Sequence, residues 1–282
     1  MNHGSVRPET DESRVFIVTG AGRGIGRAIS ERLLAEGHRV LGADLEIKAA
    51  ASGLQGVTHT SREEMLQLVK MDVAEDDAGD RLVERGVSAF GGVDGLVNCA
   101  GIFPTSPALE IGVEDWDSLM AVNLRAPFFL SQAVARYLIK DERPGVIVNV
   151  SSSAAGTTRP GIAHYSASKA ALTMLTRSLA VEWAEYGIRV NAVAPGLVES
   201  PGVEELLLSE AGQEEHRRKI ANIPAKRPGS VGEVARCVAF LLSENSSYVT
   251  GHALAVDGGY SAGRTLQPLP KEELEPGGET GT

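Results

Sequence analysis

Three residues in the second half of the chain, Ser152, Tyr165 and Lys169, are of types that could together move a proton. Tyr165 and Lys169 are four residues apart, so on a helix their side chains project from the same face. Taking hydride from a carbinol carbon requires loss of the hydroxyl proton, but a tyrosine with a pKa of about 10 is a poor base at neutral pH. A lysine ammonium one helical turn away favours the phenolate, and a serine hydroxyl can orient the substrate oxygen. Without further context, such a pair is more typical of a helix surface.

A glycine-rich segment near the N-terminus, residues 19–26, is the second chemical feature. It follows the apolar run 15–18 and precedes an amphipathic stretch, the setting in which such a turn binds phosphate. Small residues let the backbone approach a pyrophosphate, whose charge is met by free amides and the helix dipole. The glycines are spaced Gly20-x-x-x-Gly24-x-Gly26 rather than G-x-G-x-x-G. By itself, the turn could be only a tight connection.

Two aspartates follow later apolar runs. Asp44 stands at about the separation expected of a carboxylate that binds the adenosine ribose hydroxyls, and a carboxylate there repels a 2′-phosphate. Arg23 argues the other way, because a guanidinium in the turn could pair with that phosphate, unless it points into solvent or neutralises Asp44. We give Asp44 the greater weight and predict NAD rather than NADP. Asp72 could accept from the adenine amino group or be a solvated acid.

The elements that must position these residues alternate between apolar runs and helical patterns. Such alternation predicts an α/β fold, with a Rossmann-type doubly wound parallel sheet flanked by helices in a single domain. Sites in such folds lie at the carboxyl ends of the strands. Gly37 is expected just after the first helix, since glycine readily takes the left-handed conformation. The predicted strands are 15–18, 40–43, 66–71, 95–98, 146–150, 188–193 and 253–256, and the predicted helices are 25–36, 80–90, 113–140, 165–186 and 231–242.

The motifs together resemble those of the short-chain dehydrogenase/reductase family, in the branch with TGxxxGxG and YxxxK patterns. The resemblance spans about residues 14–260, and so many motifs in register are not expected by chance. In chain order they are Thr19-Gly-x-x-x-Gly-x-Gly26, Asn98-Cys-Ala-Gly101, Asn123 in a helix, the seryl strand end 151–153, Tyr165-x-x-x-Lys169 and Pro195-Gly196.

The resemblance implies a catalytic tetrad of Asn123, Ser152, Tyr165 and Lys169. In that mechanism Tyr165 is the general acid/base, while Lys169 lowers its pKa and hydrogen-bonds the nicotinamide ribose. Ser152 orients the substrate oxygen, and Asn123 holds a water of a proton relay through its backbone carbonyl, which would also explain a polar residue inside a long helical pattern. Ser152 is preferred to its two serine neighbours on its spacing to Tyr165, with Ser153 next.

The resemblance also implies further contacts to the dinucleotide. The segment that runs beside the adenine ribose is usually Asn-Asn-Ala-Gly, and Cys99, interpreted as a small buried residue, replaces the second Asn here. A threonine usually meets the nicotinamide carboxamide after Pro-Gly, and Ser200 stands at that position. The predicted cofactor-binding residues are Gly20, Arg23, Gly24, Ile25, Gly26, Asp44, Asp72, Val73, Asn98, Ala100, Gly101, Tyr165, Lys169, Pro195, Gly196, Val198 and Ser200.

The sequence says little about the substrate. The resemblance implies a mobile lid at about 197–227, which mixes leucines with glutamates, although any amphipathic surface helix has the same pattern. Ile102, Phe103, Arg159 and His164 could approach the pocket, Arg159 as a ligand for a substrate carboxylate and His164 more simply as a packed residue. The partner we expect is therefore a small-molecule alcohol or ketone of unspecified identity.

The composition limits the other kinds of partner that the protein is expected to have. A formal charge of −10 argues against nucleic acid as a bulk electrostatic partner. The sequence contains no run of about 18 apolar residues, so no membrane span is expected. Two cysteines in unlike contexts indicate neither a disulfide framework nor a metal site, so a reducing cytoplasm is expected. A homodimer or homotetramer is implied by the resemblance. One catalytic domain, 14–263, is predicted between a polar tail at 1–13 and a Pro/Gly/Glu-rich tail at 264–282.

Two other functions fit parts of the pattern. An epimerase or dehydratase of the extended branch would more often show G-x-x-G-x-x-G and carry a substantial C-terminal substrate domain, and neither is present. A cofactor-sensing protein that kept the fold but lost catalysis would be expected to lack part of the tetrad. Loss of alcohol turnover in Tyr165→Phe with NAD binding intact would distinguish an enzyme from such a protein.

Overall fold

The computed structural model describes residues 13–47, 62–199 and 208–263. The predicted C-terminal tail and nearly all of the predicted N-terminal tail lie outside these residues, as do Ser200 and part of the predicted lid. Within the described chain, one seven-stranded parallel sheet is covered by helices in a Rossmann-like single domain, as the alternating pattern predicted.

The strands of this sheet follow the order β3-β2-β1-β4-β5-β6-β9. The order reverses between β1 and β4, which is the topological switch point where such sheets bind ligands. Strands β1 and β4 are buried over their whole length, as expected where helices cover both faces. The bounds are β1 Val15–Thr19, β2 Arg39–Asp44, β3 Leu66–Lys70, β4 Gly95–Asn98, β5 Gly145–Val150, β6 Ile188–Pro195 and β9 Ala253–Val256.

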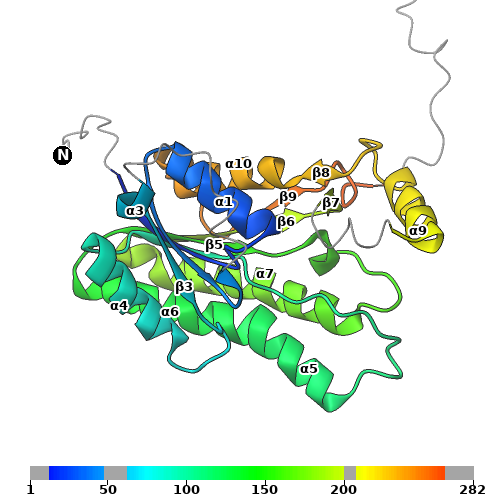
Figure 1. Ribbon diagram of the computed structural model, residues 1–282, viewed down its shortest axis with the longest axis horizontal. Coiled ribbons are helices and arrows are strands. Elements are labelled where there is room, and N and C mark those ends of the chain that lie inside the picture. The colour runs from blue at the N-terminus through cyan, green and yellow to red at the C-terminus, as the bar shows by residue number, and fades with distance from the viewer. Residues whose placement is uncertain (1–12, 48–61, 200–207, 264–282) are drawn as a thin grey trace, which may run out of the picture.

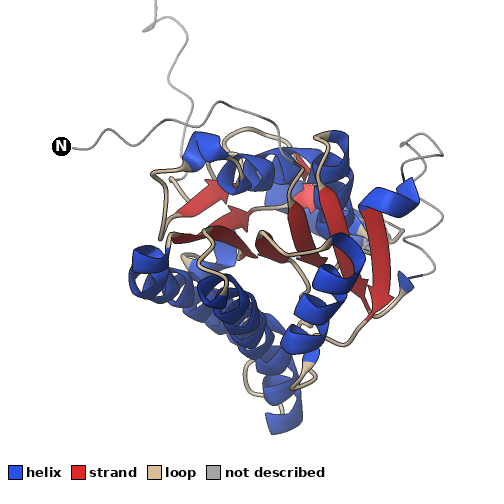
Figure 2. Ribbon diagram, turned by 90° about the vertical axis from the view of Figure 1, so that its left-hand side faces the viewer, coloured by secondary structure: helices blue, strands red, loops and turns tan. Residues whose placement is uncertain are grey.

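Helices form a layer on each face of the sheet (Figures 1 and 2). In Figure 1, α1 and α10 lie above the strands, and α4, α5, α6 and α7 lie below them. Each layer has its own apolar core, one around Ile29, Leu33 and Val238 and the other around Leu82, Leu130 and Leu179. The bounds are α1 Gly24–Ala35, α3 Arg62–Met65, α4 Ala78–Phe90, α5 Val113–Met120, α6 Ala126–Lys140, α7 Ala163–Trp183, α9 Glu210–Ala221 and α10 Val231–Leu242.

Two of these helices differ from the predicted ranges at ends that matter for the site. Helix α1 ends at Ala35 and Gly37 has φ +86°, so the glycine follows the helix as expected. Helix α7 begins at Ala163, two residues earlier than predicted, which puts Tyr165 inside its first turn.

The predicted continuous helix 113–140 is interrupted. Residues Ala121–Arg125 form a π-helical turn between α5 and α6, and Asn123 lies inside it, fully buried. A π turn interrupts the regular i→i−4 hydrogen bonding, a distortion that is often found at functional sites. Pro127 occupies the first turn of α6, where its missing N–H costs little.

A second, two-stranded sheet was not predicted from the sequence. It pairs β7, Val198–Glu199, with β8, Gly229–Ser230, and lies near α9 at one end of the molecule (Figure 1). Two-residue strands are too short to leave an alternating pattern, which explains why the sequence did not indicate them.

A line of polar side chains crosses the apolar interior beneath the sheet. Asn98 on β4 donates to Asn149 on β5 (2.8 Å) and to Ser131 on α6 (3.0 Å), and Asn149 donates to Thr176 on α7 (2.9 Å). All four side chains are almost completely buried. These bonds join the sheet to the two helices that flank the site.

Candidate active site

The carboxyl ends of β1 and β4 are tied together by one hydroxyl. The Thr19 Oγ accepts from the amides of Cys99 (3.0 Å) and Ala100 (3.1 Å) and donates to the Val97 carbonyl. The glycine turn and the segment after β4 therefore lie against each other at the switch point. In the sequence Thr19 is visible only as part of the glycine motif, and no local pattern indicates the distant partners of its hydroxyl.

The glycines of the turn lie where side chains would collide with backbone. A Cβ on Gly20, which has φ +68°, would lie 3.0 Å from the Ala100 Cα, and one on Gly26 would lie 2.1 Å from the Gly20 oxygen. Gly24 has φ +56° with open space beside it. Helix α1 starts there with no side-chain cap on its first amides and no acid in its first turn. The first turn of α1 thus presents free N–H groups, as a bound phosphate requires.

The Asp44 carboxylate is the acidic group of this turn. Its two oxygens accept from the amides of Gly22 (2.8 Å) and Glu46 (3.0 Å), so it holds the glycine turn against the end of β2. Each carboxylate oxygen has a second lone pair, which leaves acceptors for ribose hydroxyls. Arg23 is exposed and makes no ion pair with Asp44 in the described chain. Asp72 accepts from the Ala74 amide (2.9 Å) and is partly buried.

Tyr165 and its two predicted partners meet at the end of β5. The Ser152 hydroxyl lies close enough to the Tyr165 side chain to lower the pKa of Tyr165, and the Lys169 Nζ lies 5.7 Å from the centre of the Tyr165 ring. Ser151 instead turns into α7, where its hydroxyl bonds to Lys169 O and Thr173. Of the three consecutive serines, Ser152 is therefore the one in contact with the tyrosine.

Burial has the largest effect on the pKa values of Tyr165, Lys169 and Cys99. Burial raises the pKa of Tyr165, and the hydrogen bond from Ser152 partly opposes it. The spacing and the family resemblance predict that Lys169 lowers that pKa, but the Lys169 ammonium is turned to donate to the Val150 carbonyl (2.9 Å). Burial lowers the pKa of Lys169 to about 8 and raises that of Cys99 to about 12, so Cys99 stays a thiol.

The buried Lys169 predicts a pH dependence of stability. Its folded pKa of about 8 is below its unfolded value of 10.5, so the unfolded state binds more protons between these values. The free energy of unfolding, measured relative to Lys169→Met, should therefore rise between pH 8 and 10.5, by on the order of 3 kcal/mol. Urea denaturation of both proteins from pH 7 to 10.5 measures this difference, and parallel profiles would contradict it.

Asn123 contacts the segment after β4 rather than Tyr165 directly. Its Oδ1 accepts from the Ile102 amide and its Nδ2 donates to the Ile102 carbonyl, both at 2.9 Å. Nδ2 also reaches the Ser168 hydroxyl at 3.5 Å. A Cβ on Gly101 would lie 3.3 Å from the Asn123 Oδ1 and 3.7 Å from the Lys169 Nζ. The π turn thus places Asn123 beside the lysine and fixes the segment that follows Gly101.

Phe103, which was expected only to approach the pocket, is in direct contact with Tyr165. Its ring meets the Tyr165 ring edge to face, with centroids 4.5 Å apart and planes at 85°, and it is 51% exposed. The Arg159 guanidinium lies 5.8 Å from the centre of the same ring. His164, by contrast, is buried, and its Nδ1 has no partner among the described residues.

The other predicted cofactor contacts occupy the ends of neighbouring strands. Val73 is buried after β3, Pro195 ends β6, and Val198 begins β7. A Cβ on Gly196 would lie 2.7 Å from the Asp257 Cβ, so the chain after β6 packs closely against the segment after β9. The buried Asn98 Oδ1 has no partner within the described chain.

These features fit a dinucleotide. Free amides at the start of α1, open space beside Gly24 and acceptors on Asp44 lie at one edge of the sheet, and Lys169 and Tyr165 lie further along it. No cluster of three or more metal-ligating side chains occurs in the described residues. None of the helices described there has both the length and the apolar character to cross a membrane.

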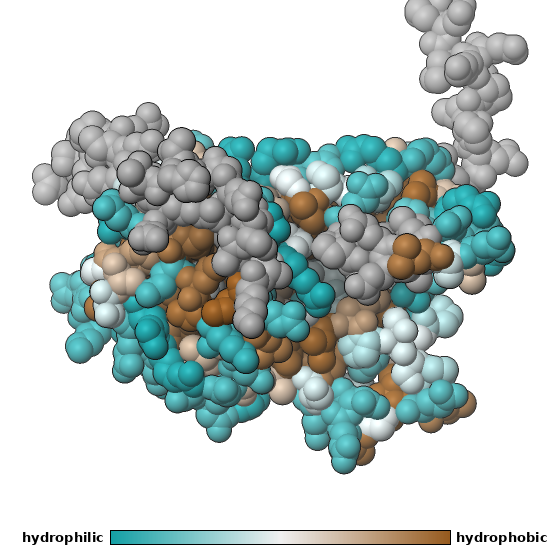
Figure 3. All heavy atoms as spheres, viewed as in Figure 1, coloured by the Kyte–Doolittle hydropathy of each residue, from teal (hydrophilic) through white to brown (hydrophobic). Residues whose placement is uncertain are grey.

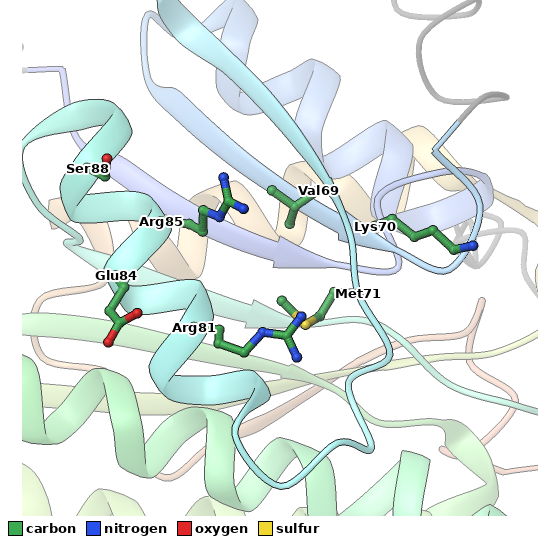
Figure 4. A pocket seen from close by; sticks show the side chains of 7 residues that line it. All are labelled: Val69, Lys70, Met71, Arg81, Glu84, Arg85 and Ser88. Atoms are coloured by element: carbon green, nitrogen blue, oxygen red, sulfur yellow. The ribbon is translucent and has the colours of Figure 1, made fainter.

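A separate hollow of about 410 Å³ lies between β3 and α4 (Figure 4). Val69 and Met71 supply its apolar part, and apolar atoms are visible over β3 in Figure 3. Arg81, on its α4 side, is already paired with Glu75 and Asp77. None of the predicted site residues lines this hollow.

The chain matches a known family model and is similar in sequence to known proteins. Residues 20–261 match a family model described as enoyl-(acyl carrier protein) reductase. The chain is 40% identical over 254 residues to 2-(R)-hydroxypropyl-CoM dehydrogenase of Xanthobacter autotrophicus, covering 89% of this chain and 99% of that protein.

Two solved structures are similar over most of their length. A candidate 2-deoxy-D-gluconate 3-dehydrogenase from Agrobacterium tumefaciens with bound NADP aligns with a TM-score of 0.78 at 34% identity, covering 91% of this chain and 100% of that one. A 4-hydroxyisoleucine dehydrogenase complexed with NADH aligns with a TM-score of 0.80 at 28% identity, covering 89% and 100%. A nicotinamide dinucleotide is thus the ligand common to both.

Proposed function

Because this chain belongs to the short-chain dehydrogenase/reductase family, we propose that it is an NAD-dependent dehydrogenase of a secondary alcohol/ketone pair. Membership makes it an oxidoreductase that acts on hydroxyl or ketone groups. The single observation that best supports the proposal is the group at the end of β5, where Tyr165 contacts Ser152 and lies one helical turn from Lys169.

Each member of the group has a separate task in this proposal. Tyr165 takes the proton from the substrate hydroxyl, or returns it to the ketone, and Ser152 holds the substrate oxygen against it. Lys169 binds the nicotinamide ribose and favours the phenolate by its charge. Asn123 holds a water through its backbone carbonyl, by which protons pass to solvent. The nicotinamide, when bound, accepts or supplies the hydride.

The remaining predicted contacts hold the dinucleotide. The glycine turn and the start of α1 bind the pyrophosphate, and Ala100 and Gly101 lie along the ribose. Asp72 and Val73 bind the adenine, while Pro195, Gly196 and Val198 pass beside the nicotinamide. Ser200, which lies outside the described residues, is proposed to meet the carboxamide.

The preference for NAD rests on Asp44. A carboxylate in this position accepts from both ribose hydroxyls and repels a 2′-phosphate. The related structures hold NADP in one case and NADH in another, so the family alone leaves the choice open. Arg23 is exposed near the same turn and is the residue that would favour NADP.

A spectrophotometric screen of secondary alcohols with NAD⁺ and NADP⁺ in parallel tests this function. The expected result is NADH formation from at least one class of alcohol, at a higher kcat/KM than with NADP⁺. Binding of NADH without turnover of any alcohol or ketone would instead favour a cofactor-sensing protein of this fold.

We also propose that the enzyme is a cytoplasmic homodimer or homotetramer. An apolar groove of about 980 Å³ runs between α5, α6 and α7, lined by Trp116, Phe129 and Met174, which are 40%, 46% and 57% exposed. A second copy would cover this apolar face. Both cysteines are free thiols, as is usual in a reducing compartment. Sedimentation velocity that shows only monomer at micromolar concentration would contradict the assembly.

A further inference from the structure

On the basis of the proposed function, we propose that the substrate carries a carboxylate remote from its carbinol carbon, and that Arg159 binds it. The substrate class is then a hydroxy acid and the corresponding oxo acid. The observation behind this is that the Phe103 ring contacts both the Tyr165 ring and the Arg159 guanidinium.

Phe103 links the two polar side chains. The centre of its ring lies 4.5 Å from the centre of the Tyr165 ring and 5.8 Å from the Arg159 guanidinium, and half of its surface is exposed. An exposed aromatic ring in contact with both a proton-transferring residue and a cation suits a substrate with an apolar middle. The carbinol end lies at Tyr165 and the anionic end at Arg159.

The backbone that carries Arg159 is held in place. The Gly161 carbonyl accepts from the Ser106 amide (3.0 Å), and the Thr158 hydroxyl bonds to Ser166 on α7 (3.1 Å). Gly161 has φ +84°, which lets the chain turn from this loop into α7. Arg159 is therefore displayed from a loop anchored on both sides, as a binding residue must be to act at fixed geometry.

The segment that carries Phe103 is held by Asn123. Both backbone groups of Ile102 are bonded to the Asn123 amide, and Phe103 is the next residue. The same buried side chain that lies beside Lys169 thus sets the position of the apolar wall. Asn123 therefore lies beside the polar part of the proposed substrate site, at Lys169, and also positions its apolar part, at Phe103.

Arg159 has donors to spare. It is half-buried, and toward the rest of the described chain it makes one hydrogen bond, a 3.3 Å contact from Nη1 to the adjacent Pro160 carbonyl. A guanidinium has five N–H donors in a planar fork that matches a carboxylate. Among the described residues no carboxylate lies within ion-pair distance of Arg159.

Charge balance favours a carboxylate over a phosphate dianion. Among the described acids, Glu215 on α9 is one whose pKa Arg159 lowers, although its hydrogen bond with Lys219 is the larger cause. Glu215 is already paired with Lys219 at 2.7 Å. Arg159, Lys219 and Glu215 together carry one net positive charge, which one carboxylate neutralises.

Matched pairs of secondary hydroxy acids and their methyl esters, four to seven carbons long, test the proposal with NAD⁺. The wild type should prefer the acid by about 10- to 100-fold in kcat/KM, as expected for a charge-assisted bidentate hydrogen bond. Arg159→Gln should bring the acid-to-ester ratio close to one, mainly by raising KM for the acid, and Arg159→Lys should restore part of it. Arg217→Gln, which removes the same charge from a 72% exposed side chain on α9, should leave the ratio unchanged.

The possible outcomes distinguish a failure of the carboxylate proposal from a failure of the proposed function. Oxidation of esters as well as acids, with a ratio insensitive to Arg159→Gln, overturns the carboxylate and leaves the dehydrogenase intact. If no member of the panel is oxidised, calorimetric titration of the same hydroxy acids into the enzyme with NADH decides. Binding that Arg159→Gln weakens tenfold supports the site, and no binding of any acid that depends on Arg159 overturns it.

Discussion

Replacing Tyr165 by phenylalanine is expected to lower kcat/KM for any alcohol that the enzyme oxidises by about 10²- to 10⁴-fold, the usual contribution of a positioned acid/base group. The phenylalanine ring keeps the edge-to-face contact with Phe103 and loses only the hydroxyl that meets Ser152. The measurement is the steady-state formation of NADH from the best alcohol of the screen.

Two controls make this result specific. The dissociation constant for NADH, measured by fluorescence, should stay within about twofold of the wild type, because the hydroxyl is assigned to the substrate. Tyr248→Phe removes the same hydroxyl from a fully exposed side chain and should leave turnover unchanged. Wild-type turnover by Tyr165→Phe would remove the tyrosine from the mechanism, whatever the substrate.

The second large effect concerns cofactor choice. Asp44→Asn should lower the ratio of kcat/KM with NAD⁺ to that with NADP⁺ by about 10- to 100-fold, because it weakens the bonds to the ribose and removes the repulsion of a 2′-phosphate. The asparagine oxygen can still accept from Gly22 or Glu46, so the turn is disturbed less than by alanine. Parallel kinetics with both cofactors on one alcohol measure the ratio.

Arg23 supplies the complementary arm of this experiment. If its exposed guanidinium meets the 2′-phosphate, Arg23→Gln in the Asp44→Asn background should reverse most of the gain with NADP⁺. A wild-type enzyme that prefers NADP⁺, or an unchanged ratio in Asp44→Asn, would show that the carboxylate serves only to hold the glycine turn.

The sequence predicted those parts of the molecule that depend on local pattern. Fully buried parallel strands give continuous apolar runs, so the approximate bounds of the sheet strands along the chain could be predicted. The glycine turn was identifiable because its backbone conformation and close approaches exclude side chains. The spacing of Tyr165 and Lys169 predicted a shared helix face, and their side chains do lie together.

Features that depend on contacts between distant segments were not predictable. No local signal indicates that the hydroxyl of Thr19 bonds to amides 80 residues away, or that Phe103 rests against Tyr165. The pKa of Tyr165 was judged from the neighbouring lysine, whereas burial, which the sequence does not reveal, dominates it in the protein alone. The π turn was visible only as a polar residue in a helical pattern, because one extra residue per turn leaves little trace in apolar periodicity.

The buried line from Asn98 through Asn149 to Thr176 also bears on how the chain folds. Asn98 and Asn149 are opposite each other in the β4–β5 pairing. If β5 slipped by one residue against β4, its side chains would exchange faces and both amides would lose their partners in an apolar interior. Each orphaned amide group costs about 1–3 kcal/mol, whereas the valines of these strands would pack almost as well in either alignment. The two asparagines therefore penalise misaligned sheets, and they select the pairing that brings the ends of β4 and β5 level at the edge of the sheet where the glycine turn lies.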